Sequence, residues 1–166
     1  FNDMGTPGGS DDQLASWSSR GVTVDGYAKP DVVAPGVGVT STLAKNSNFA
    51  KEHGSPVIDR QYITLDGTSA SAAVVSGSVA LMLQDEPGLT PDQVKFRLMH
   101  SGASLSGSAA LKVDAGAAVA STVTDGANGD GVPNDLIDPG TGEIMYDSVL
   151  WRSVLWRSVL WRSVEG

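Results

Sequence analysis

Residues 69–84 form a continuous stretch of 16 residues without a charged side chain. Alanine, valine and leucine dominate the stretch, with serines and one glycine between them. As an α-helix, a segment of this length would span roughly 24 Å. A helix that is apolar on nearly every side is a buried one. We therefore expect a buried helix here, and the fold must supply neighbours that cover it.

Ser69 lies at the first position of this stretch, directly after Asp66, Gly67 and Thr68. The first N–H groups of a helix have no internal partner, and the helix dipole makes that end positive. A serine there commonly acts as an N-cap. It can instead act as a nucleophile, with a nearby N–H stabilising the developing oxyanion. Gly-Thr-Ser alone favours the cap, whereas the rest of the chain favours the nucleophile.

Composition narrows the classes of function. The chain has 166 residues, enough for one domain of ordinary size. It carries 11 basic and 19 acidic residues, a formal charge of -8, which argues against a nucleic-acid partner. Cysteine is absent, which excludes disulfides and thiolate chemistry, and no apolar run is long enough to span a membrane. Because the first residue is Phe1 rather than methionine, we expect the natural chain to begin earlier.

Periodicity and breaker residues predict the order of elements. The sequence from Thr90 to Gln93 is a strong helix start, with a threonine cap, a proline at the first helical position and a glutamine that completes a capping box. Gly102 is placed to end that helix. Strands followed by helices suggest an α/β layer architecture. The predicted segments are loop over 1–28, strands within 29–36, 37–42 and 62–65, a surface loop over 43–60, and helices over 69–84, 91–101 and 114–120.

Three motifs follow one another in a fixed order along the chain. Residues 18–21 read Ser-Ser-Arg-Gly, residues 29–36 read Lys-Pro-Asp-Val-Val-Ala-Pro-Gly, and residues 67–77 begin with Gly-Thr-Ser. In this order they resemble the Ser-Ser-x-Gly turn, the Lys-Pro-Asp-x-x-Ala-Pro-Gly segment and the nucleophile motif in the C-terminal half of the catalytic domain of the subtilisin-like serine proteases. The resemblance covers about residues 1–120. It implies an α/β fold of the subtilisin-like type, here the C-terminal half of a three-layer parallel-sheet domain.

The resemblance implies a serine endopeptidase that acts on polypeptides and needs no organic cofactor. Ser69 would be the nucleophile of an Asp-His-Ser triad, with Gly67 and Thr68 supporting the oxyanion hole. The family's Asp, His and oxyanion Asn lie upstream of the serine, and this chain has no His-Gly-Thr-His motif. We therefore expect a fragment that is inactive alone, with the missing N-terminal half as a partner. The family also implies an extracellular, bacterial location.

Two features speak against simple transfer of the activity. Ala70, Ala73 and Val74 replace the family's usual Met, Pro and His in the nucleophile motif. An alternative is therefore a catalytically inactive, structural relative. Neither histidine is expected to be the base, because His53 lies in a polar loop and His100 at a helix C-terminus, where positive charge is favourable.

Three parts are expected along the chain: the protease part at 1–121, an acidic Gly/Asp/Pro linker at 122–147, and a Ser-Val-Leu-Trp-Arg repeat tail at 148–166. The linker resembles calcium loops, in which closely spaced oxygen ligands surround one ion. Its candidate Ca²⁺ ligands are Asp125, Asn128, Asp130 and Asp135. The alternatives are a plain linker or, with the tail, a calcium-dependent surface-binding module. Because a five-residue repeat fits neither the helical nor the strand period, the tail should lie outside the core.

Overall fold

The chain divides into two compact units in the computed structural model. One unit comprises residues 1–20 and 30–127, and the other comprises residues 21–29 and 128–166. The structure describes residues 1–23, 27–44, 47–52, 57–58, 61–127, 138 and 140–141. Ser69 and the elements around it all belong to the first unit.

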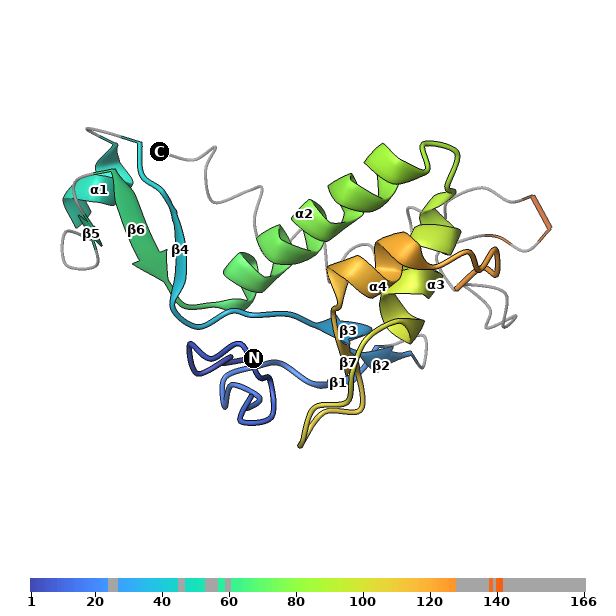
Figure 1. The fold of residues 1–166 in the computed structure, drawn as a ribbon, viewed down its shortest axis with the longest axis horizontal. Helices are drawn as coiled ribbons and strands as arrows, with labels where there is room; N and C mark the ends of the chain where they lie inside the picture. The colour runs from blue at the N-terminus through green and yellow to red at the C-terminus, as the bar shows by residue number, and fades with distance from the viewer. Residues whose placement is uncertain are drawn as a thin grey trace. The chain divides into compact units, whose positions relative to one another are not determined.

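Small sheets and helices make up the first unit, in agreement with the predicted α/β class (Figure 1). Its strands are β3 (Val32–Val33), β4 (Val39–Thr42), β5 (Val57–Ile58), β6 (Tyr62–Leu65) and β7 (Leu111–Lys112). Its helices are α1 (Asn48–Glu52), α2 (Thr68–Asp85), α3 (Pro91–His100) and α4 (Ala115–Ala120). In the second unit, β1 (Gly21–Val22) pairs antiparallel with β2 (Ala28–Lys29).

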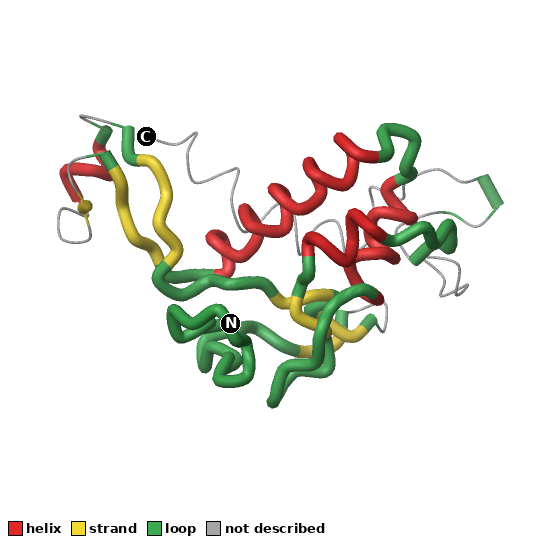
Figure 2. Tube along the Cα trace, in the orientation of Figure 1, coloured by secondary structure: helices red, strands yellow, loops and turns green. Residues whose placement is uncertain are grey.

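Strand β6 is the central strand of a three-stranded antiparallel sheet and leads directly into α2. Its neighbours are β4 and β5, and Val39 of β4 lies opposite Leu65 at the end nearest α2. Figure 2 shows β6 continuing through a short loop into the first turn of the helix. Because β4 and β6 are held in register, the end of the sheet fixes where α2 begins.

Strands β3 and β7 pair in parallel, with Val32 opposite Leu111. Among the described strands, parallel pairing is confined to these two. Two apolar clusters lie around them. One combines Met82, Leu89, Val94, Leu98 and Ala118, and the other combines Phe1, Val33, Leu105 and Ala110. The first cluster joins α2, α3 and α4, so it anchors the C-terminal part of α2.

The prediction that α2 is buried on nearly every side is wrong for this structure. Buried positions of the helix are Ser78 and Met82, whereas Leu81 is 53% exposed and Leu83 is 38% exposed. Helix α4 packs against α2 (Figure 1). The charge-free sequence makes every side of the helix apolar, but the described neighbours do not surround it. A large part of its apolar surface is therefore exposed.

The start of α3 confirms the predicted capping box. Gln93 N–H donates to Thr90 Oγ1 at 3.3 Å, and Thr90 N–H donates to Gln93 Oε1 at 2.9 Å. The segment after α4 then runs back along α3. Arg97 Nε donates to the Val123 carbonyl at 2.8 Å, and Gln93 Nε2 donates to the Thr124 carbonyl at 3.2 Å. These bonds hold residues 121–127 against the helix.

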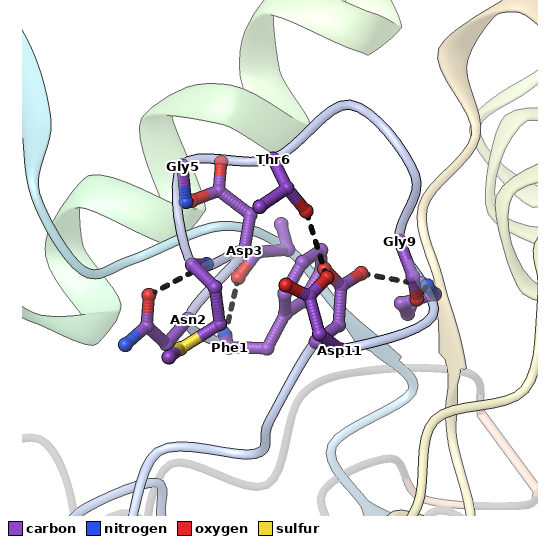
Figure 3. Close-up of polar contacts among 11 residues, drawn as sticks. Phe1, Asn2, Asp3, Gly5, Thr6, Gly9 and Asp11 are labelled. Atoms are coloured by element: carbon purple, nitrogen blue, oxygen red, sulfur yellow. Dashed lines mark hydrogen bonds and ion pairs between the residues drawn. The ribbon is translucent and has the colours of Figure 1, made fainter.

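The N-terminal loop is ordered by short-range polar contacts, which Figure 3 shows in close-up. Met4 N–H donates to Asn2 Oδ1 at 2.9 Å, and Thr6 Oγ1 donates to Asp11 Oδ1 at 2.7 Å (Figure 3). The largely buried Asp12 carboxylate pairs with Lys112 Nζ of β7 at 2.6 Å. This ion pair ties the loop to the parallel strand pair.

Two predicted loops contain short elements. The segment 1–28 includes β1, and the segment 43–60 includes α1 and β5. Strand β5 covers two residues and is held by pairing with β6. A strand of two residues is too short to show the alternating pattern of a strand, so periodicity along the chain does not reveal it.

Candidate active site

Ser69 is the second residue of α2, and its side chain is exposed. The helix begins at Thr68, and its N-cap is Gly67, with φ of 147°. No side-chain hydrogen bond caps this helix end. The interpretation of Ser69 as a structural N-cap is therefore wrong. Its hydroxyl lies at the positive end of an 18-residue helix without a capping role.

Three hydrogen bonds attach the residues on both sides of Ser69 to residues 34–38, which link β3 to β4. Gly67 N–H donates to the Gly36 carbonyl at 2.7 Å, and Gly38 N–H donates to Asp66 Oδ1 at 2.7 Å. Ser71 Oγ donates to the Ala34 carbonyl at 3.1 Å. Because these bonds precede and follow Ser69, they fix its backbone on both sides.

Gly36 permits the close approach on which this attachment depends. A Cβ at position 36 would lie 2.2 Å from Ser71 Oγ and 3.0 Å from the Gly67 carbonyl oxygen. Any side chain at this position would push the turn away. The glycine of the Ala-Pro-Gly segment therefore lets the Gly-Thr-Ser turn pack closely against this segment.

Ser69 lies on the wall of a pocket of about 680 Å³. The other walls come from residues 39–41 of β4, from Leu65 and Asp66 at the end of β6, and from Ala70, Ala73 and Val74 of α2. The three residues of this chain that differ from the family's nucleophile motif, Ala70, Ala73 and Val74, thus all line this pocket. Thr68 instead lines a smaller pocket of about 210 Å³, together with residues 17–19.

Neither histidine is placed beside Ser69 by the described structure. His100 lies in the last turn of α3, where its Nδ1 is 2.8 Å from the Phe96 carbonyl oxygen and its ring stacks on Phe96 at 3.9 Å. His100 does not line the pocket that holds Ser69. His53 lies outside the described residues. The part of the chain that the structure describes therefore provides no histidine at this pocket.

The predicted calcium site is largely outside the described structure. Asp125 lies in the exposed stretch after α4, while Asn128, Asp130 and Asp135 lie outside the described residues. The described residues contain no cluster of three or more metal-binding side chains. Calcium binding at this segment stays a prediction.

Comparison with known families assigns this sequence to one of them. The model of the subtilase family matches residues 8–134, most of the chain. The chain belongs to the subtilase family.

Three of the similar proteins come from Bacillus subtilis and Aquifex aeolicus. The serine protease AprX of Bacillus subtilis is 46% identical over 100 residues, which are 60% of this chain and 23% of AprX. The uncharacterized protein aq_aa18 of Aquifex aeolicus is 43% identical over 86 residues, 50% of this chain and 37% of that protein. The minor extracellular protease Vpr of Bacillus subtilis is 32% identical over 95 residues, 57% of this chain and 11% of Vpr. No solved structure matches significantly.

The chain thus aligns with about a tenth to somewhat over a third of these relatives. No helix in the described ranges combines the length and apolarity that a membrane crossing needs.

Sequence reasoning missed some residues that shape this site. Asp66 and Gly38 were not predicted as partners, since they are 28 positions apart and the link between them is one hydrogen bond. The signal that could have found them is the position of Asp66, directly before the Gly-Thr-Ser turn, together with a glycine just after Ala-Pro-Gly.

Proposed function

We propose that this chain carries the nucleophile of a serine endopeptidase, with Ser69 attacking the carbonyl carbon of a peptide bond. The observation that carries the proposal is the position of Ser69: exposed, second in α2, without a capping bond, and on the wall of a pocket. Membership of the subtilase family and similarity to named serine proteases support the same chemistry.

The proposed reaction needs groups that the described residues around Ser69 lack. A histidine, oriented by an aspartate, takes the Ser69 hydroxyl proton as Ser69 attacks and the tetrahedral intermediate forms. It donates this proton to the amine, which leaves as the C–N bond breaks and the acyl-enzyme forms. The Ser69 N–H, with Gly67 and Thr68 shaping the turn and an asparagine side chain as second donor, stabilises the oxyanion. We propose that the aspartate, histidine and asparagine come from a part of the protease outside these 166 residues, and that this chain alone is inactive.

The exposed surface of α2 supports a partner for this chain. Leu81 and Leu83 leave apolar area exposed on a helix that has no charged residue from 69 to 84. The exposed residues Ala73, Gly77 and Ala80 lie between these two leucines on the helix surface, and an exposed apolar face of this kind marks an interaction site. We propose that the remaining half of a three-layer catalytic domain covers this surface. The relatives, which are several times longer than the aligned segment, have room for that half.

The presence of Ala73 and Val74 in place of the family's usual Pro and His is compatible with a second candidate, a catalytically inactive relative. Helix α2 nevertheless starts at Thr68 without a proline in its first two turns, so the nucleophile scaffold forms without that residue. This favours an active enzyme. We also propose an extracellular location, supported by the similarity to the minor extracellular protease Vpr.

Peptide hydrolysis by the full-length protein tests this function. Ser69→Ala should lower kcat by several orders of magnitude, because the nucleophile is lost. Ser76→Ala is the matched control, since Ser76 is an exposed serine of the same helix whose Oγ bonds to the Ala72 carbonyl. Equal activity of the wild type and Ser69→Ala would refute the proposed function.

A further inference from the structure

Among the described residues that line the pocket beside Ser69, Asp66 alone has an ionisable side chain. The other described lining residues are uncharged, and most of them are apolar, including Val39, Leu65 and Val74. Thr40 and Ser41 add small hydroxyls on one side. A carboxylate among uncharged described neighbours gives this part of the pocket a preference for positively charged groups.

The orientation of the Asp66 carboxylate is fixed by the backbone. Gly38 N–H donates to Asp66 Oδ1 at 2.7 Å, from a residue whose φ is 66°, a left-handed conformation that favours glycine. One bond from an N–H uses only part of the acceptor capacity of a carboxylate. Asp66 is also exposed, so its charge remains accessible to a ligand in the pocket.

A lysine or arginine side chain matches this arrangement better than an acidic or a purely apolar one. Its aliphatic stem can lie along Val39 and Leu65 while its cationic head pairs with Asp66. The volume of about 680 Å³ is within the ordinary range for ligand pockets and exceeds what one side chain fills. A stretch of substrate backbone can therefore enter with the side chain.

We propose that Asp66 is a specificity-determining residue that favours polypeptide substrates with Lys or Arg near the scissile bond. This inference rests on the proposed function, because it assumes that Ser69 is the nucleophile. A competing use of the pocket is the docking of the remaining half of the catalytic domain, with Asp66 serving only to hold the turn.

Peptide cleavage by the full-length protein tests the proposal. Two peptide sets would differ only in Lys or Gln at each of three positions on either side of the cleaved bond. We expect kcat/KM to favour Lys at one position by about fivefold, the size typical of a partly exposed ion pair. The ratio should fall as salt is raised, because ions screen the pair. A wild-type ratio near one at every position would overturn the proposal.

Asp66→Asn separates charge from structure. The asparagine Oδ1 can still accept from Gly38 N–H, while the negative charge is removed. The Lys-to-Gln ratio should drop to about one. Asp85→Asn removes the same charge about 24 Å along α2 and should keep the wild-type ratio.

The outcomes distinguish this inference from the function on which it rests. A Lys preference that survives in Asp66→Asn would overturn the role of Asp66. A lower yield of folded Asp66→Asn with an unchanged ratio would assign Asp66 to domain docking and would also overturn it. Absence of cleavage of every peptide, with no labelling of Ser69 by a fluorophosphonate, would reject the proposed function itself.

Discussion

At the scale of single residues, Gly36 is a position beside Ser69 where the structure leaves no room for a side chain. We predict that Gly36→Ala destabilises the protein by about 1–3 kcal/mol, the range for overpacking a close contact. Ser71 Oγ can rotate away from the new methyl group, but the Gly67 carbonyl belongs to the backbone of the nucleophile turn. Urea unfolding of the full-length protein measures the change.

Gly88→Ala is the matched control for this prediction. A Cβ at Gly88 has no neighbour within 4 Å, so the substitution should be close to neutral. Equal stability of the two variants would show that Gly36 does not seat the Gly-Thr-Ser turn. A loss confined to Gly36→Ala would support the proposed link between the Ala-Pro-Gly segment and the nucleophile.

At the scale of elements, the sequence is most informative where a signal is local. The Thr90–Gln93 capping box was predictable because all its partners lie within one helical turn. Strands β4 and β6 were also predictable, since each is a short run of suitable residues. The pairing of β3 with β7 joins residues about 80 positions apart, and no local pattern encodes it.

Arg97 links two elements, α3 and the segment that follows α4. Its side chain is 2% exposed, and its Nη1 lies 2.8 Å from Glu86 Oε2, whose side chain is 51% exposed. We predict that Arg97→Met costs about 1–3 kcal/mol, because the Val123 carbonyl loses its donor. Glu86 regains water at the surface and adds little to this cost. Hydrogen exchange should become faster across residues 121–127.

Lys95→Met is the control in the same helix. Lys95 Nζ lies 3.7 Å from Asp31 Oδ1, and both side chains are about one-third exposed, so this ion pair should contribute no more than about 1 kcal/mol. If exchange in 121–127 is equally fast in the wild type and in Arg97→Met, Arg97 does not hold that segment.

At the scale of the whole molecule, the predicted burial of α2 differs from its burial in the structure. The absence of charge from residues 69–84 predicts a helix covered on all sides, and the described residues cover only part of it. The sequence of a helix indicates whether the helix is suited to burial. It does not indicate whether the elements that bury it belong to the same 166 residues. The position of Ser69 was predictable from a local motif; its pocket, assembled from β4, β6 and α2, was not.

A substitution at Gly77 of α2 tests whether this face of the helix is exposed or covered. A Cβ at Gly77 has no neighbour within 4 Å in this structure. In the 166-residue chain, Gly77→Ala should therefore stabilise the helix by about 0.5–1 kcal/mol. In the full-length protein we expect the gain to vanish or reverse, because a covering layer would meet the new methyl group. An equal gain in both proteins would contradict a layer packed closely over Gly77.

The central claim is that the Ser69 hydroxyl is an activated nucleophile, and covalent labelling measures that property most directly. Full-length protein would be treated with a fluorophosphonate, and the modified residue identified by mass spectrometry of its peptides. We predict one adduct, on Ser69, that forms in the native protein and is absent after denaturation and in Ser69→Ala. Native protein that stays unlabelled at Ser69, or that is labelled at a different serine, would contradict the account.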